Sequence, residues 1–489
     1  MNIPSVVKVN LALIGEILMV SMAFPLKREI SYQNPLAIFA GFAPADGAVF
    51  LDSAQLREGS RFSFIAVSPF MQLRSKNGLV ELDGRRRIDD PFQVLAEKIK
   101  QFPLPQLAGL PPFQGGVAGY FGYGLYQHLE KLAISNHDDM QFPDAVLGFY
   151  DLVIAFDLIA CRAWIFSSGY PEQGADRASR AEQRLQWCLA QIPQAPIPLP
   201  RAGEFKIAST VVSNFTATTY QIAVKKVIDY ILAGDIFEAN IAQRFSAKLG
   251  KDCSPFDLYL RLRELNPAPF AAYLNFNDVV IASASPERFL KLYQRQVEAR
   301  PIKGTRARSS DAKLDTQLAV ELQTSVKDRA ENIMIVDLLR NDLSRVCKDF
   351  TVKVTKLCAL ESYATVHHLV SVVVGELVAS ATALDLLRAT FPGGSITGAP
   401  KIRAMEIINE IEPTARGPYC GSIGYLGFDG SMDCAITIRT FAIKNGIVTF
   451  QAGGAVVADS VPVLEYEETL AKAQVLWQAL TGMVHDFAD

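Results

Sequence analysis

Two titratable residues in the middle of the chain, Glu287 and Lys303, each follow a short extended run. Apolar or alternating runs bounded by turn-forming residues favour β-strands, so we predict strands at 281–285 and 296–299. A lysine between an isoleucine and a glycine can lose solvation, which lowers its pKa toward the nucleophilic range. A glutamate close to it could give or take a proton. The pair indicates covalent acid–base catalysis, although a surface Glu and a surface Lys on a hairpin would fit the same pattern.

Four carboxylates occur as two pairs with helical spacing, Asp328 with Glu331 and Glu465 with Glu468. Residues three apart share one face of a helix. One such pair alone is typical of a solvated face with ion pairs to neighbouring basic residues. If the two helices face each other, the four carboxylates instead suit Mg²⁺, which prefers few protein carboxylates, several waters and a substrate oxygen.

Arg439 lies in a predicted strand meander over 421–457, between the hairpin turns Asp429-Gly430 and Asn445-Gly446. The alternation of its neighbours places it in the middle of a strand. A guanidinium is costly to bury without an anion, and a substrate carboxylate is a natural bidentate partner. An internal salt bridge would satisfy it equally well, and the residues alone leave both interpretations open.

Strands and one helix that could support these residues are expected in the first half of the chain. We predict two strands within 46–69, paired strands at 147–159 and 162–168, and a helix at 175–191. The proline-rich segment 193–200 cannot be helical and indicates a linker.

The second half opens with a predicted helix, for which Thr218 and Gln221 form the capping box and Gly234 the stop. The glycine-rich segment 391–403 enters another helix, whose free N–H groups attract an anion. It lacks the Lys-Ser/Thr of a nucleotide-binding P-loop, which removes the main argument for a nucleotide site.

Composition narrows the function further. The chain has 489 residues, 49% of them hydrophobic, and a net charge of −3 with interspersed acidic and basic residues, which gives no sign of affinity for nucleic acid or a lipid surface. Seven scattered cysteines without a CxxC pair indicate a reducing, cytoplasmic setting. The apolar run at 10–24 is too short to span a membrane, which leaves a packed N-terminal helix or an extension upstream of the natural start. Of these two we expect the extension, at 1–24, with Met22 as the natural start.

Several segments resemble motifs of the chorismate-utilising enzymes. SPERF, PIKGTR, DRAEN and EYEET occur in the order in which the family carries them, and the resemblance is dense from Thr216 onward but looser over 46–150. GDIFEANIAQRF is similar to the family's GDIYQVNLSQRF, from which it departs at Phe237, Glu238 and Ala239.

Lys303, at the third position of PIKGT, resembles aminodeoxychorismate synthase component I, whereas anthranilate and isochorismate synthases more often carry Ala there. The resemblance implies conversion of chorismate and ammonia to 4-amino-4-deoxychorismate, for p-aminobenzoate and folate biosynthesis, through an adduct on Lys303. No glutaminase motif is visible, so a separate glutamine amidotransferase subunit would supply the ammonia. Anthranilate synthase component I and a non-catalytic chorismate- or tryptophan-binding protein are the alternatives.

The resemblance also implies an α+β fold, with two lobes of mainly antiparallel β-sheet flanked by helices and the active site between them. Residues 25–200 would be the family's N-terminal region, and residues 210–485 its chorismate-binding catalytic domain.

Residue roles follow from the same resemblance. Glu287 would protonate the leaving hydroxyl and His368 would face the substrate ring. Direct Mg²⁺ ligands would be Glu331 and Glu468, with Asp328 and Glu465 in support. The implied substrate contacts are Ser395, Tyr419, Arg439, Gly454, Ala455 and Lys472, of which Ala455 stands where the family has Gly. The implied tryptophan pocket comprises Ser53, Gly59, Ser60, Arg61, Phe62, Pro269, Phe270 and Ala271.

Overall fold

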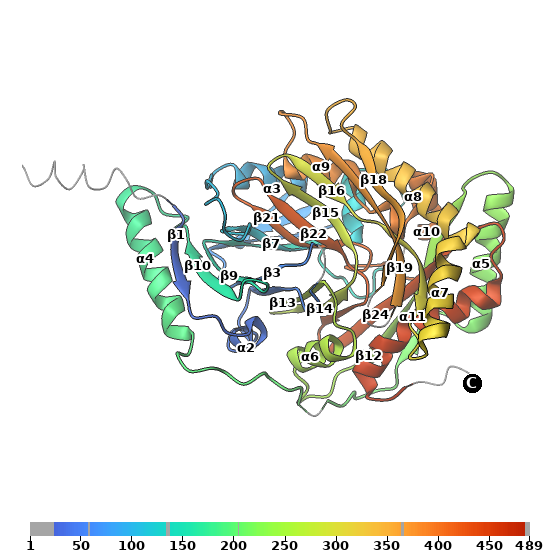
Figure 1. The fold of residues 1–489 in the computed structure, drawn as a ribbon, viewed down its shortest axis with the longest axis horizontal. Helices are drawn as coiled ribbons and strands as arrows, with labels where there is room; N and C mark the ends of the chain where they lie inside the picture. Colours follow the sequence, from blue (N-terminus) through green and yellow to red (C-terminus); the bar gives the residue numbers. More distant parts are fainter. Residues whose placement is uncertain (1–23, 57–58, 134–136, 204, 363–365, 485–489) are drawn as a thin grey trace, which may run out of the picture.

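A computed structural model describes residues 24–484 except 57–58, 134–136, 204 and 363–365 (Figure 1). Apart from its last residue, the predicted N-terminal extension at 1–24 lies outside the described residues, and so does Met22. Within the described part of the chain, none of the helices has the length and apolar character needed to cross a bilayer.

Two large antiparallel sheets form the framework. Sheet I contains, in spatial order, β1 (Leu26–Ile30), β10 (Arg162–Ser167), β9 (Leu152–Asp157), β3 (Phe62–Ala66), β2 (Ala48–Asp52), β13 (Phe270–Phe276), β14 (Val279–Ser285), β23 (Thr440–Lys444), β24 (Ile447–Val456), β12 (Glu238–Lys248) and β11 (Val212–Ser213), with β20 (Gly398–Ala399) beside β12. Sheet II contains, in spatial order, β17 (Ile302–Ala307), β19 (Val366–Glu376), β16 (Gln296–Ala299), β15 (Arg288–Tyr293), β22 (Met432–Ile436), β21 (Ser422–Gly427), β7 (Gly116–Phe121), β8 (Ala145–Tyr150), β4 (Met71–Lys76), β5 (Leu79–Leu82) and β6 (Arg85–Ile88), with β18 (Lys353–Ser362) beside β19.

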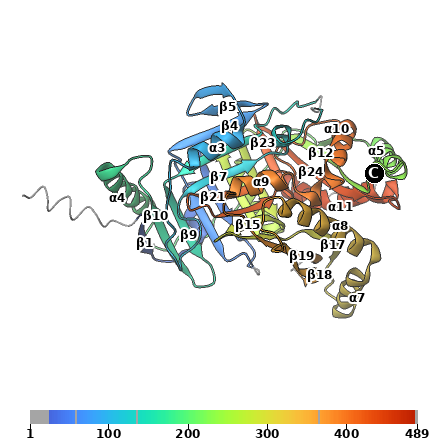
Figure 2. The same ribbon diagram turned by 90° about the horizontal axis from the view of Figure 1, so that it is seen from above.

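Helices cover the outer faces of the two sheets. They are α2 (Pro35–Ala40), α3 (Pro91–Ile99), α4 (Gly174–Gln191), α5 (Ala217–Leu232), α6 (Pro255–Leu265), α7 (Ala312–Thr324), α8 (Val326–Ser344), α9 (Ala383–Thr390), α10 (Lys401–Ile411) and α11 (Pro462–Thr481), with 3₁₀ turns η1 (Tyr123–His128) and η2 (Gly394–Ile396). In Figure 2, α4 lies beside β1 and β10 at one end of the molecule, whereas α5, α10 and α11 gather at the other.

Four hydrophobic clusters of the described residues hold these layers together, one of which packs α5 and α10 against β12. A second joins α2, α6 and α11 to sheet I, and a third joins α3, α8 and α9 to sheet II. The fourth lies between the sheets, where Phe64 of β3 meets Tyr425 of β21 with ring centroids 5.6 Å apart. This arrangement confirms the predicted α+β fold with two antiparallel sheets and flanking helices.

Each sheet takes strands from both predicted parts of the chain, 25–200 and 210–485. The two predicted domains therefore do not correspond to the two sheets. Their boundaries stay a prediction. The segment predicted as one strand at 147–159 is two strands, because β8 belongs to sheet II and β9 to sheet I, and β9 pairs with β10 as predicted. The chain changes sheet at Asp151, whose buried carboxylate is paired with Arg184 at 3.1 Å.

A second change of sheet corrects the prediction for Arg439. The chain leaves sheet II at the end of β22 and enters sheet I at β23, so Arg439 stands at the crossing, in a left-handed conformation with φ 52°, and not in mid-strand. The predicted capping box of α5 is also wrong, since Thr216 and Thr219 form it. Both predicted hairpins and the predicted end of α5, followed by Gly234 at φ 87°, are confirmed.

Substitution of one glycine tests how closely the strands of sheet II pack. Gly119 of β7 has φ 155°, and a Cβ there would lie 2.1 Å from the carbonyl oxygen of Val146 on β8. We expect Gly119→Ala to lower the free energy of unfolding by about 3 kcal/mol or more, through overpacking and backbone strain. Chemical denaturation measures the loss. Gly84→Ala is the control, because its φ is also positive but nothing lies within 4 Å, so about 1 kcal/mol is expected. Equal losses in the two variants would contradict this packing.

Candidate active site

Most of the predicted site residues line one cavity of about 640 Å³. Its walls come from both sheets and from helices α8 and α11. Eleven of the thirteen predicted catalytic, substrate-binding and metal residues line it: Glu287, Lys303, Asp328, Glu331, His368, Ser395, Tyr419, Arg439, Ala455, Glu468 and Lys472. Gly454 and Glu465 lie behind the wall, where a Cβ on Gly454 would stand 3.3 Å from a carboxylate oxygen of Glu465 and of Glu468.

A β-bulge directs Lys303 into this cavity. The register of β17 against β19 shifts between Lys303 and Thr305, and the intervening Gly304 has φ 82°. Such a bulge turns a side chain out of the regular alternation. A Cβ at Gly304 would lie 2.9 Å from the Cβ of Asp328, so glycine lets α8 approach the strand.

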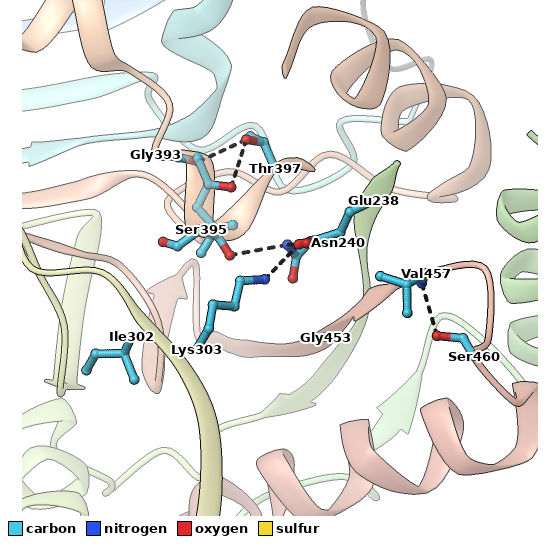
Figure 3. A network of polar contacts seen from close by, with 12 residues as sticks. Glu238, Asn240, Ile302, Lys303, Gly393, Ser395, Thr397, Gly453, Val457 and Ser460 are labelled. Carbon is cyan, nitrogen blue, oxygen red and sulfur yellow. Dashed lines mark hydrogen bonds and ion pairs between the residues drawn. The ribbon is translucent and has the colours of Figure 1, made fainter. Parts of the chain in front are cut away.

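The Lys303 ammonium donates a hydrogen bond of 2.7 Å to Oε1 of Glu238 on β12 (Figure 3). Burial by itself lowers the pKa of Lys303, but Glu238, Glu331 and Glu287 outweigh burial and raise that pKa above its usual value. The predicted lowering of the Lys303 pKa is therefore wrong. At rest Lys303 is an ammonium, which must lose a proton before it can act as a nucleophile.

Glu287 is suited to donate a proton near neutral pH. Its side chain is buried between β14 and β15, and burial raises its pKa to about 7. Oε1 accepts hydrogen bonds from the Ser395 hydroxyl at 2.8 Å and from the backbone N–H of Ile302 at 3.4 Å. These contacts hold the carboxyl group at the cavity, where its protonated form is a general acid.

His368 lines the same cavity from β19, next to the strand that carries Lys303. Its Nδ1 shares a hydrogen bond of 2.8 Å with the hydroxyl of Thr305. The partner fixes the orientation of the ring.

Arg439 and Lys472 form the cationic part of the wall. Burial lowers the pKa of Arg439, which donates a hydrogen bond to the carbonyl of Lys472. None of the described carboxylates forms an ion pair with Arg439, so the internal salt bridge left open by the sequence is not formed among them. Arg439 is half-buried, and a guanidinium in such a position without a counter-ion favours an anionic ligand such as a carboxylate.

Ala455, which stands where the family has Gly, fits the backbone at the cavity wall. It pairs with Asn240 in the regular ladder between β24 and β12, in an ordinary strand conformation. The Cβ is therefore accommodated at the cavity wall.

Helices α8 and α11 bring the four acidic residues to one side of the cavity, but their carboxylates are not equivalent. Asp328 accepts a hydrogen bond from Arg306 at 3.1 Å, and Glu465 accepts one from Ser460 at 2.6 Å. Glu468 pairs with Lys472 at 2.5 Å and is 49% exposed. Glu331 has no hydrogen-bond or ion-pair partner among the described residues, and burial raises its pKa to about 7.

An unpaired, partly buried carboxyl group facing a cavity fits a cation. Across the described residues, no cluster of three or more acidic, His or Cys side chains is arranged to hold a metal by itself. A cation at Glu331 would thus need oxygen ligands from water or from a bound molecule, which is the mode that Mg²⁺ prefers.

A second cavity, of about 290 Å³, unites all eight residues of the predicted tryptophan pocket. Ser53 closes one wall by donating a 2.7 Å hydrogen bond to the carbonyl of Phe62, and Arg61 pairs with Asp157 at 2.5 Å. The geometry places these residues together, and tryptophan binding stays a prediction.

The sequence reasoning missed Glu238 as a site residue. It was visible as a departure from a family motif, but its contact with Lys303 spans 65 residues of sequence. Its position two residues before Asn240 was an available signal, because alternate strand residues share a face and Asn240 lines the cavity.

Comparisons with known proteins agree with this site. Residues 48–478 match the chorismate binding enzyme family, and the chain belongs to that family. Anthranilate synthase component 1 of Thermus thermophilus is 42% identical over 92% of this chain and 95% of its own length. Aminodeoxychorismate synthase component 1 of Salmonella typhimurium is 43% identical over 84% of this chain and 88% of its own length.

Among solved structures, anthranilate synthase component I from Streptococcus pneumoniae aligns with a TM-score of 0.75 and 33% identity, covering 86% of this chain and 93% of its own. The chain is therefore an enzyme that acts on chorismate. Relatives of two different activities are about equally similar, so similarity alone does not choose between the two activities.

The buried carboxyl group of Glu287 generates a pH prediction. Because its raised pKa of about 7 keeps it protonated at lower pH, the step that uses this acid should be constant below pH 7. The step should slow about tenfold per pH unit above it. Chorismate consumption, measured at a constant concentration of free ammonia, reports the profile. Glu287→Gln should lose roughly 10²- to 10⁴-fold in rate and abolish this dependence. A variant that keeps the wild-type profile would contradict the assignment.

Proposed function

We propose that the chain is the chorismate-binding component of an aminodeoxychorismate synthase, converting chorismate and ammonia to 4-amino-4-deoxychorismate for p-aminobenzoate and folate biosynthesis. The observation that carries the proposal is a primary amine, Lys303, directed by a bulge into the cavity that also holds the acid Glu287. Relatives of that name at 40–43% identity support it.

The chemistry needs both residues. The C4 hydroxyl of chorismate is a poor leaving group, so Glu287 protonates it while neutral Lys303 adds at C2 with an allylic shift, and water departs. The adduct is a secondary ammonium. Ammonia then adds at C4, the double bond shifts back, and Lys303 leaves as a neutral amine. One difficult substitution becomes two easier ones, as in covalent catalysis generally.

The cationic wall supports binding of the substrate anion. Arg439 has no carboxylate partner among the described residues, and it donates a hydrogen bond to the carbonyl of Lys472. Together they suit a carboxylate of chorismate. The hydroxyl of Ser395, which donates to Glu287, keeps the acid oriented.

Mg²⁺ is proposed as the cofactor. Glu331 and Glu468 would hold it. Asp328 and Glu465 would support the site while keeping their hydrogen bonds from Arg306 and Ser460. When bound, the ion would offset the repulsion between these carboxylates and an anionic substrate.

The nitrogen source is proposed to be ammonia released by a separate glutamine amidotransferase subunit. The curated relatives are named as component 1 of their enzymes, which supports a second component. Neither a nucleic acid nor a membrane is proposed as a partner.

Anthranilate synthase component I is the second candidate, supported by relatives at 42% and 38% identity over 92% of this chain. It would aminate C2 and eliminate pyruvate to form an aromatic product. A chain that makes anthranilate from chorismate and ammonia would replace the first proposal with this one.

Substitution of Lys303 tests the proposal. With chorismate, ammonium and Mg²⁺, we expect the wild type to form 4-amino-4-deoxychorismate, identified by mass spectrometry. Lys303→Ala should lose this product on the order of 10³-fold or more, because the nucleophile is gone. Lys303→Arg is the matched control: it keeps the positive charge opposite Glu238 but supplies no nucleophile, and it should be equally inactive. Amination at C4 by either variant at near wild-type rate would refute the covalent route.

Removal of the unpaired carboxylate tests the metal site. We expect Glu331→Gln to weaken Mg²⁺ binding in the presence of chorismate by roughly tenfold or more, because a ligand is lost. Calorimetric titration of Mg²⁺ measures this change, and turnover should fall with it. Glu467→Gln, on the exposed face of α11, should leave both unchanged. Wild-type Mg²⁺ affinity in Glu331→Gln would exclude this residue as a ligand.

A further inference from the structure

The contact between Lys303 and Glu238 has a consequence for how the proposed nucleophile is activated. Their side chains are 9% and 0% exposed, and 2.7 Å separates the ammonium nitrogen from the carboxylate oxygen. An ammonium has no lone pair with which to attack carbon. Its proton must pass to an acceptor, and the buried position leaves little access for bulk water.

Three other carboxyl groups face Lys303 electrostatically: Glu287, Glu331 and Glu468. Among the described residues, none of the three forms an ion pair with it. Glu287 is already hydrogen-bonded to Ser395 and is needed as an acid. Glu238 is therefore the carboxylate with a direct path to the proton.

Glu238 has the local environment of a proton acceptor. Its Oε1 accepts from Lys303 and, at 3.3 Å, from the side-chain amide of Asn240, which also donates to the carbonyl of Ser395 at 3.2 Å (Figure 3). Its Oε2 is buried without a hydrogen-bond partner. A carboxylate oxygen without a donor keeps its lone pairs available to accept a proton.

A second buried pair in the molecule provides a comparison. Lys401 donates to Asp342 at 2.6 Å and to the carbonyl of Thr390 at 2.8 Å, and it does not line the cavity. Among the described residues, the ammonium of Lys303 has one hydrogen-bond acceptor, whereas that of Lys401 has two. The Lys401 pair thus serves as a control for burial alone.

We propose that Glu238 is the general base that takes the proton from Lys303 and so makes its amine nucleophilic. The proposal rests on the covalent role proposed for Lys303 above. Proton transfer converts the ammonium and carboxylate into a neutral amine and a carboxylic acid. The amine then bonds to the substrate carbon, and Glu238 returns its proton to Lys303 after the lysine leaves.

The pair is neutral overall before and after this transfer, so activation of Lys303 in the wild type needs no proton exchange with solvent. Without Glu238, the proton must go to solvent, and the fraction of neutral amine rises with pH. This difference separates a base from a residue that merely supports the fold.

The test compares wild type, Glu238→Gln and Asp342→Asn with Mg²⁺ and chorismate but without ammonia. Rapid quenching and intact-protein mass spectrometry give the rate of adduct formation across pH. At pH 7 we expect Glu238→Gln to be about 100-fold slower. The ratio of wild-type to variant rates should fall about tenfold per pH unit until Lys303 of the variant titrates, whereas the contribution of Glu287 cancels in this ratio. Asp342→Asn should match the wild type.

Glu238→Asp is a second variant, which keeps a carboxylate. It should be slower than the wild type but retain the wild-type pH profile, and it keeps the proposal testable if Glu238→Gln folds poorly. A rate ratio for Glu238→Gln that does not change with pH, or an unchanged rate, would overturn the proposal.

Carbamylation by cyanate separates this proposal from the function on which it rests. Peptide mapping reports the reactivity of Lys303 without chorismate, relative to other lysines of the same sample. The quantity compared is the ratio of Lys303 labelling in the wild type to that in Glu238→Gln, and we expect this ratio to fall as pH rises. If the wild type forms no adduct with chorismate but the labelling ratio falls in this way, the covalent function fails and the role of Glu238 stands. If the labelling ratio does not fall, Glu238 is not the base.

Discussion

A buried ion pair joins the two sheets at the centre of the site. Glu238 comes from β12 of sheet I and Lys303 from β17 of sheet II, and their contact is 2.7 Å long. Two buried charges stabilise a fold only when each has its partner in place. The aromatic core between the sheets, with Phe64 and Tyr425 in edge contact, fixes their separation. The chemistry proposed for Lys303 thus depends on how accurately the sheets stack.

Two charged residues of the cavity wall have no partner of opposite charge among the described residues. Arg439 has no carboxylate partner and Glu331 has no cation partner among the described residues, although both line one cavity. A folded protein leaves buried charges unpaired at a cost, which is recovered when a ligand supplies the missing partners. An anionic substrate for Arg439 and a cation for Glu331 would do so. Glu287 likewise forms no ion pair among the described residues, and burial raises its pKa to about 7.

Sequence reasoning succeeded where local residues decide the structure. Strands near 281–285 and 296–299, the helix-spaced carboxylates of α8 and α11, and both glycine-containing hairpin turns are present. It failed where the sequence pattern continues through a change of sheet, as at Asp151 and Arg439. Apolar alternation is the same on either side of such a crossing, so it does not mark the break.

The prediction that the pKa of Lys303 is lowered failed for a different reason. Its neighbours in sequence are apolar or small, which suggests desolvation, but the carboxylates that raise the pKa come from β12, α8 and the segment before β15. Only the fold brings them together. The same limit applies to the choice of reaction, because relatives of both activities are about equally similar to this chain.

Covalent catalysis by Lys303 requires a bond between its amine nitrogen and a substrate carbon, and this bond can be detected by mass. The wild-type chain is mixed with chorismate and Mg²⁺ without any nitrogen source, quenched in acid, digested and mapped by mass spectrometry. We expect the peptide containing Lys303 to gain the mass of chorismate less one water, and added ammonium to release the adduct. An unmodified Lys303 peptide under conditions that support turnover with ammonium would contradict covalent catalysis by Lys303.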